Sequence, residues 1–340
     1  MDGCPAQFTF KEPLSNKLEF ISCGNSKSFA NNPALVKKTM NKEDRYSHLV
    51  PMDPLLCKLS PYLWHTIQSI IIKEGKSDCI VWDSSTVICP TDIVMNQVTP
   101  VAKEAPITFE QVKGQVYADI YNTLVSYPNA RILLGLEEIN ACFRFARIHV
   151  DLTSASGFIA DDLFNLATAM VFGSTASASS WEAFCRAIEA LTKVFANRPD
   201  LVIKHQRYLD MIRWDDISLP INITQAFPCT INWGIIDDRG NRIDLPAWIY
   251  VDNAVMLAIN IKHLKMVLVA MIEAIFVVMG EPNKLVWQCP LAMDKWSDLI
   301  IGPQQTILGL VIDTDKMMVS IPNKYRHKVL NLLNTTWHSN

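Results

Sequence analysis

The sequence lacks the features that mark several classes of protein. None of its nine cysteines belongs to a Cys-x-x-Cys pair, which argues against a zinc site and a disulfide framework and suits a reducing compartment. The formal net charge is only −3, so no overall basic field attracts nucleic acid, and such contacts need a local patch. The N-terminus has no basic segment followed by an apolar one, as a secretory signal has. We therefore expect an intracellular protein.

Long apolar runs are also missing. The longest one, residues 266–279, carries Glu273 and is too short to span a bilayer. It predicts a buried helix, and no membrane partner is expected. Internal repeats and low-complexity tracts are absent from the sequence. At 340 residues the chain is long enough to bury a large core and to form two packed units.

Helical and strand patterns alternate along most of the chain. Residues 1–59 are the exception, because they mix proline, serine, asparagine and lysine with few apolar repeats, and we expect a poorly ordered extension. The predicted helices cover about residues 60–75, 108–126, 179–195, 262–279 and 324–335, and the predicted strands about 78–82, 131–136, 305–312 and 317–321. Helices that interleave with antiparallel hairpins indicate an α+β fold.

Residues 249–259 predict a buried hairpin. Two apolar arms flank Asp252-Asn253, a dipeptide that tolerates the positive φ angles of a tight turn. A carboxylate at the tip of a buried hairpin is costly unless a partner pairs with it, and a metal ion is the usual partner. The alternative is that Asp252-Asn253 only makes a good turn.

A second acidic site follows the apolar strand predicted over residues 131–136. Glu137 and Glu138 stand at the end of that strand. If the strand neighbours the hairpin, Glu138 and Asp252 converge, and two carboxylates at adjacent strand ends can hold divalent ions. The alternative is that these two glutamates are a solvated strand end.

Three motifs follow one another in the sequence. Residues 133–143 (LLGLEEINACF) contain an apolar strand, an acidic residue and an aromatic residue five positions later. Residues 172–181 (FGSTASASSW) place small residues after Phe-Gly, and residues 250–253 (YVDN) match a Tyr-x-Asp-Asp motif except at the last position. This order resembles the palm of reverse transcriptases from LTR-type and related eukaryotic retrotransposons.

The resemblance covers about residues 73–336 and implies a right-hand polymerase fold, in which fingers adjoin a palm with an antiparallel sheet backed by helices. Residues 60–130 would then be fingers-like, and residues 131–322 palm-like, with a primer-contacting hairpin over 305–321. Residues 323–340 would begin a thumb or connection. Because the chain stops soon after that hairpin, we expect most of a thumb and an RNase H domain to be missing, as in a truncated retroelement product.

The resemblance also implies roles for individual residues. The catalytic positions are Glu138, Asp252 and Asn253, of which Glu138 and Asp252 would bind metal. The nucleotide-binding positions are Phe143, which would exclude a ribose 2′-hydroxyl, Phe172, Gly173 and Tyr250. The implied reaction is attack of a primer 3′-hydroxyl on the α-phosphate of a deoxynucleotide, with two magnesium ions and a nucleic-acid template-primer.

Two departures from the family's pattern weaken this chemistry. Glu138 is one methylene longer than the family's aspartate, and magnesium demands near-ideal octahedral oxygens at roughly 2.0–2.1 Å. Asn253 replaces a charged ligand with a neutral one. We expect much weaker metal binding and little or no polymerisation. Two alternatives remain open: a non-catalytic palm-fold domain that binds nucleic acid or a protein, and an ordinary α+β domain with chance motifs.

Overall fold

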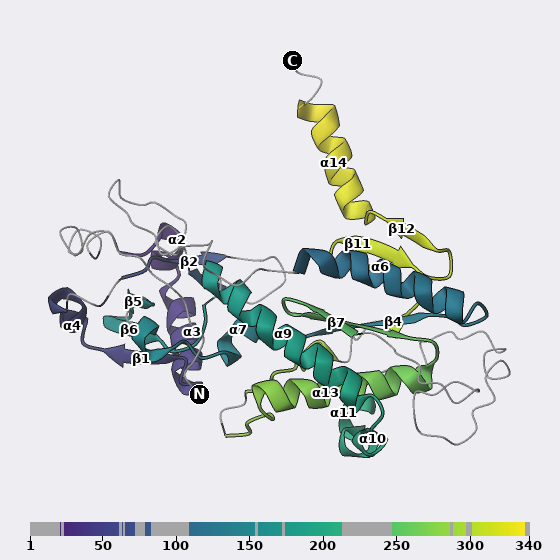
Figure 1. The fold of residues 1–340 in the computed structure, drawn as a ribbon. Coiled ribbons are helices and arrows are strands. Elements are labelled where there is room, and N and C mark those ends of the chain that lie inside the picture. The colour runs from purple at the N-terminus through teal and green to yellow at the C-terminus, as the bar shows by residue number, and fades with distance from the viewer. Residues whose placement is uncertain are drawn as a thin grey trace. The chain divides into compact units, whose positions relative to one another are not determined.

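The structure is a computed structural model that describes residues 21, 24–60, 63, 65–71, 79–82, 109–153, 156–171, 174–212, 247–285, 288–296 and 301–336. The chain divides into two compact units, each assembled from three separate stretches. The first unit comprises Met1–Ile107, Ala141–Ala183 and Pro282–Gln288, and the second Thr108–Asn140, Phe184–Glu281 and Cys289–Asn340. Each combines helices with antiparallel sheets (Figure 1), which confirms the predicted α+β class.

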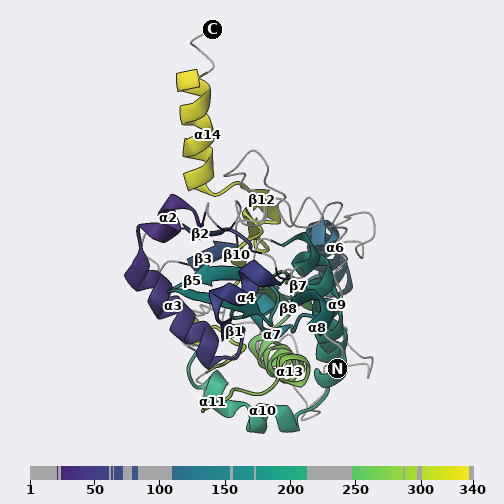
Figure 2. The same cartoon turned by 90° about the vertical axis from the view of Figure 1, so that its left-hand side faces the viewer.

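The first unit packs helices against small antiparallel sheets (Figure 2). Its helices are α2 (Lys27–Ala30), α3 (Pro33–Arg45), α4 (Pro54–Leu59), α7 (Cys142–Phe145) and α8 (Val150–Thr153), and its strands are β1 (Leu49–Met52), β2 (Gln68–Ile71), β3 (Cys79–Trp82), β5 (Gly157–Ala160) and β6 (Leu163–Ala167). The strands form one sheet in the order β1-β6-β5 and another from β2 and β3. Phe29 of α2, Val36 and Met40 of α3, and Phe158 of β5 share one apolar core.

The expectation that residues 1–59 are poorly ordered is wrong for residues 24–59. This segment folds into α2, α3, β1 and α4. Its few apolar side chains, such as Phe29 and Val36, bury against β5 and β6, which come much later in the chain. A pattern search within the segment cannot detect partners so distant in sequence. The domain boundaries expected at residues 60, 131 and 323 stay predictions.

The helix expected over residues 60–75 is also wrong, because residues 68–71 form strand β2. The spacing of the isoleucines fits a helix, but consecutive β-branched side chains favour a strand. β2 pairs with β3, and the backbone N–H of Ile70 donates to Ser28 Oγ at 3.0 Å. Tertiary partners therefore decide the conformation of this short apolar run.

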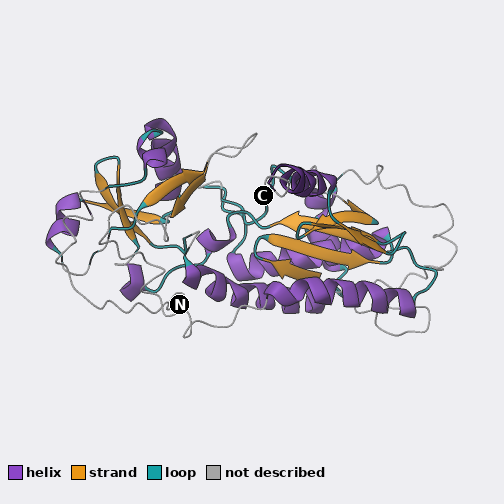
Figure 3. Cartoon of the chain, turned by 90° about the horizontal axis from the view of Figure 1, so that it is seen from above, coloured by secondary structure: helices purple, strands orange, loops and turns teal. Residues whose placement is uncertain are grey.

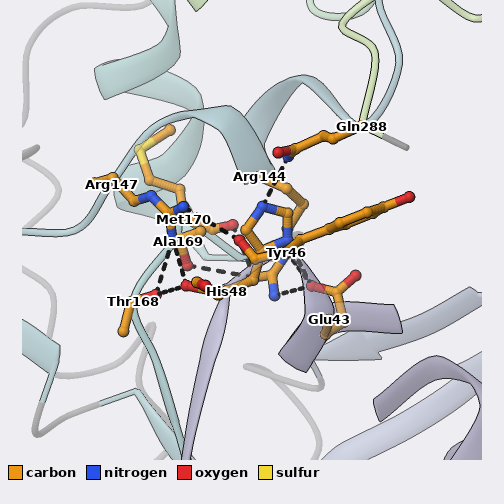
Figure 4. A network of polar contacts seen from close by, with 10 residues as sticks. Glu43, Tyr46, His48, Arg144, Arg147, Thr168, Ala169, Met170 and Gln288 are labelled. Atoms are coloured by element: carbon orange, nitrogen blue, oxygen red, sulfur yellow. Dashed lines mark hydrogen bonds and ion pairs between the residues drawn. The ribbon is translucent and has the colours of Figure 1, made fainter. Parts of the chain in front are cut away.

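A partly buried ion pair ties helix α3 to helix α7 in the first unit (Figure 4). Arg144 of α7 donates from Nε to Glu43 of α3 at 2.9 Å and also donates to two backbone carbonyl groups. His48 Nδ1 lies 3.0 Å from the same Glu43 carboxylate, and His48 Nε2 lies 3.1 Å from Gln288 Nε2. Burial alone would raise the pKa of Glu43, but the hydrogen bond from His48 and the charge of Arg144 lower it to about 2.

The second unit is built on a four-stranded antiparallel sheet in the order β7-β8-β4-β9. Its strands are β4 (Leu133–Glu138), β7 (Ala247–Tyr250), β8 (Asn253–Ala258) and β9 (Ile301–Gly302), and the helices that cover it are α6 (Phe109–Ser126) and α13 (Ile261–Met279). Helix α6 contacts β7, and α13 packs on β8 and β4 from the opposite side (Figures 1 and 2). Figure 3 shows these strands side by side and flanked by helices. This is the antiparallel sheet backed by helices that the sequence predicts.

The second unit contains several further elements. They are α10 (Asp200–Lys204), α11 (Gln206–Leu209), β10 (Gln304–Ile307), β11 (Leu310–Asp313), β12 (Met318–Ser320) and α14 (Asn323–Thr336), and α9 (Thr175–Phe195) runs from the first unit into the second. The strand expected over 305–312 is two strands, β10 and β11. Leu308 and Gly309 between them both have positive φ, at 51° and 81°, so the chain turns there.

Helix α13 confirms the buried helix expected over residues 262–279. Asn260 caps its N-terminus by accepting from the backbone N–H of His263 at 2.8 Å, and Gly280 ends it with a φ of 94°. Its one acidic residue, Glu273, pairs with Lys204 at 2.7 Å and with His205 at 2.8 Å. No helix in the described part of the chain is both long enough and apolar enough to cross a membrane.

Candidate functional site

The hairpin of β7 and β8 turns through a two-residue loop. Tyr250 pairs directly with Asn253, so Val251 and Asp252 form the loop. The predicted centre, Asp252-Asn253, is therefore wrong by one residue, because Asn253 already belongs to β8. Val251 has a φ of 56°, which is the positive angle that a type II′ turn needs at its first central residue. A β-branched residue rarely adopts this conformation, so the tip of the hairpin is strained.

Strand β4 lies beside this hairpin, as the sequence predicts. Glu138 pairs directly with Asn253 across the two strands, so their side chains share one face of the sheet. The backbone N–H of Ile139 donates to the carbonyl oxygen of Asp252 at 2.7 Å. Asn253 Nδ2 donates to Asp252 Oδ1 at 2.9 Å. The three positions expected to be catalytic therefore gather at one end of the sheet.

A lysine that the sequence analysis did not single out joins this group. The ammonium of Lys295 forms an ion pair with Glu138 Oε2. Lys295 lies in a short segment, residues 289–296, that runs along the end of β4, where Leu291 bridges Ile139. No local signal marks Lys295 in the sequence, since it depends on a contact 157 residues apart.

Helix α9 supports the hairpin from its outer edge. Among the described strands β7 lies at the edge of the sheet, so the backbone groups on its outer side need partners. Glu189 Oε1 accepts from the N–H of Ile249 at 2.6 Å, and Arg186 donates to the carbonyl of Ile249 at 3.1 Å. Arg186 and Glu189 also pair with each other at 2.5 Å. The position of the turn thus depends on side chains of α9 as well as on β8.

Glu137 stands next to Glu138 but in a different environment. Its side chain is 4% exposed, and its Oε1 has no hydrogen-bond partner among the residues that the structure describes. Burial raises the pKa of Glu137 to about 8, and the neighbouring charge of Glu138 adds to this effect. At neutral pH the Glu137 carboxyl is therefore mostly protonated. It does not behave as the solvated strand end that was one alternative for this pair.

The residues at this end of the sheet do not fit a pair of magnesium ions. Glu138 is paired with Lys295, and Asp252 accepts a hydrogen bond from Asn253. Among the residues that the structure describes, no three histidine, cysteine, aspartate or glutamate side chains come together to hold a metal ion. Two-metal catalysis needs a clamp of several anionic oxygens. We therefore derive no catalytic step through magnesium here.

The structure locates two of the four residues that the resemblance expects at a nucleotide. Phe143 belongs to the first unit, where its buried ring meets Trp181 edge-on at a centroid distance of 6.2 Å. Tyr250 is half-buried at the end of β7. Phe172 and Gly173 lie outside the described residues. The roles of all four at a nucleotide stay predictions.

Comparison with known proteins gives matches among solved structures only. No protein-family model matches the chain, and no curated protein sequence matches it. A structure of the foamy viral protease-reverse transcriptase with dsDNA is 13% identical, with a TM-score of 0.47, and the match covers 90% of this chain and 44% of that chain. The structure with an RNA/DNA hybrid is 11% identical, with a TM-score of 0.48, over 89% of this chain and 28% of that one.

The native protease-reverse transcriptase of Prototype Foamy Virus is a third such structure. It is 11% identical, with a TM-score of 0.44, and the match covers 97% of this chain and 32% of that chain. The chain therefore spans less than half the length of these three chains. Likenesses at this level assign no role to any residue of this chain.

Proposed function

We propose that the chain is a reverse-transcriptase-like domain of retroelement origin in which metal-dependent nucleotidyl transfer is impaired or lost. One observation carries the proposal: Glu138 lies directly opposite Asn253, at the tip of a Tyr-x-Asp-Asn hairpin. The order of the motifs and the apolar character of both segments predict that the strand ending at Glu138 lies beside this hairpin. Two residues support the loss of activity. Asn253 supplies a neutral amide where the family has a carboxylate, and the ammonium of Lys295 forms an ion pair with the carboxylate of Glu138.

Several finer assignments belong to this proposal. The partner would be a nucleic-acid template-primer, with Phe143, Phe172, Gly173 and Tyr250 at the nucleotide. The location would be intracellular. With a net charge of only −3, nucleic-acid affinity must come from a local patch, so it should fall steeply as salt rises.

Primer extension on the purified chain tests the proposal. With magnesium or manganese, an annealed RNA template and a DNA primer, we expect no extension above a control without protein. Fluorescence anisotropy with the same labelled hybrid should still detect salt-sensitive binding. Efficient extension by the wild type would overturn the claim of lost activity. Failure to bind the hybrid at low salt would overturn the nucleic-acid assignment.

The second candidate function is a non-catalytic palm-fold domain that binds nucleic acid or a protein. The Glu138–Lys295 ion pair favours it, because a carboxylate neutralised by an internal cation suits a structural role. Hybrid binding that is unchanged by a chelator, together with no extension in any variant, would favour this second function. Recovery of metal-dependent extension after substitution at Glu138 and Asn253 would favour the first.

A further inference from the structure

Lys295 is held against Glu138 by its backbone and not only by its own side chain. On its N-terminal side, Leu291 bridges Ile139, and the N–H of Ala292 donates to the carbonyl of Glu138 at 3.1 Å. On its C-terminal side, Trp296 is fully buried, and its Nε1 donates to the carbonyl of Tyr208 at 2.6 Å. The backbone of Lys295 is thus held between two anchors at the end of β4.

These anchors affect how strongly Lys295 pairs with Glu138. An exposed lysine pair is usually weak because a long flexible side chain must be ordered to form it. Here both side chains are about one-third exposed, at 37% for Lys295 and 36% for Glu138. Because the backbone around Lys295 is already anchored, the ammonium can meet the carboxylate without any movement of the main chain, and only side-chain freedom is lost.

We infer that the Lys295 ammonium takes the place of a divalent ion at Glu138, so that this end of the sheet carries a fixed protein cation and excludes magnesium and manganese. This inference rests on the proposed function, which identifies Glu138 as the position of a metal ligand. A divalent ion would have to displace the ammonium from Glu138 and would be repelled by it at close range. Of the three positions expected to be catalytic, Asn253 is neutral, so Glu138 and Asp252 supply the negative charge that would oppose that repulsion.

Manganese binding measured by electron paramagnetic resonance on the purified full chain tests the inference. In Lys295→Gln the affinity for manganese should rise by about tenfold, the effect expected when one charge at contact distance is removed. Lys295→Arg keeps the charge and should leave the affinity unchanged. Lys284→Gln removes the same charge from an exposed position and should also change nothing. Lys295→Gln combined with Glu138→Gln should lose the gain.

A second measurement keeps the inference testable if Lys295→Gln is unstable. A water-soluble carbodiimide joins a carboxylate to a contacting amine as an amide, and mass spectrometry should identify a Glu138–Lys295 link in the wild type. Absence of that link, or a Lys295→Gln protein that folds but binds manganese no better than the wild type, overturns the inference.

The Glu138→Asp, Asn253→Asp double variant separates this inference from the proposed function. If the double variant binds manganese and Lys295→Gln does not, only the role of Lys295 is wrong. If neither variant binds manganese, the metal-ligand assignment of Glu138 and Asp252 fails as well, and the proposed function fails with it.

Discussion

Glu138 and Asn253 face each other across β4 and β8, so an acidic side chain and a neutral amide share one face at the end of the sheet. The backbone N–H of Ile139 holds Asp252 to the same strand end. Substitutions at Glu138 and Asn253 therefore alter two opposite positions of one ladder, and both would act on the same bound ion.

Glu138→Asp with Asn253→Asp should raise the affinity for magnesium. The shorter carboxylate suits the tight octahedron, and the new carboxylate adds negative charge. Isothermal calorimetry on the wild type, both single variants and the double variant measures the effect, which should be non-additive because one site is shared. Asn334→Asp on the exposed helix α14 adds the same charge elsewhere and serves as the control. A double variant with no gain would show that these positions form no metal site.

Val251→Gly should leave the free energy of unfolding unchanged or raise it by up to about 1.5 kcal/mol. Relief of the positive φ should raise the free energy of unfolding by roughly 1–2 kcal/mol. The flexibility of glycine in the unfolded chain should lower it by roughly 0.5–1 kcal/mol. Val255→Gly, in β8 and fully buried, should instead cost about 2–4 kcal/mol. Urea unfolding of both variants makes the comparison. Equal losses would mean that the turn stores no strain.

Glu137 predicts an unusual dependence of stability on pH. Its pKa is about 8 in the folded chain against an ordinary value of 4.5. Between these values the folded state holds a proton that the unfolded state has released, so stability falls as pH rises, by up to about 1.4 kcal/mol per pH unit. Glu137→Gln removes that slope. Urea unfolding from pH 4.5 to 8.5 should show the two proteins diverging as pH rises, and parallel curves would contradict the prediction.

Replacing only one partner of the Arg144–Glu43 ion pair should destabilise the fold. Arg144→Met leaves the partly buried Glu43 carboxylate without its main counter-charge, and we expect a loss of up to about 3 kcal/mol, the lower end of the range for a fully buried pair. Glu43→Gln combined with Arg144→Met should cost less than the sum of the single changes. Lys37→Met is the control, since its pair with Asp161 is exposed on both sides. Additive losses in thermal or urea unfolding would mean that the pair does not act as a unit.

The sequence predicts the elements of the second unit better than those of the first. The pattern that buries Val112, Val116 and Ile120 predicts α6 without reference to the rest of the chain, and the apolar run with its Gly280 stop does the same for α13. The first unit depends on partners distant in sequence, so residues 24–59 look unstructured when read alone. The turn at Leu308 and Gly309 is not predicted, because the residues on both sides of it continue the strand pattern.

The sequence also predicts some features of the candidate site and not others. The order of motifs is enough to predict that β4 lies beside the hairpin. The turn centre is shifted by one residue because Val251, not the expected Asn253, takes the positive φ. Lys295 cannot be predicted at all, since nothing near it in the sequence indicates that it will meet Glu138. Local chemistry thus identifies the acidic residues, and tertiary structure decides what neutralises them.

The long separation between Glu138 and Lys295 has a consequence for synthesis on the ribosome. Lys295 is made 157 residues after Glu138, which at about 5–20 residues per second takes roughly 8–30 s. The partners of β4 on both sides, β8 and β9, also come later in the chain. Until they emerge, Leu133 and Leu134, both fully buried in the final fold, lack the strands that pair with β4. We expect slower translation to lengthen this exposure and to raise the fraction of nascent chains lost to aggregation.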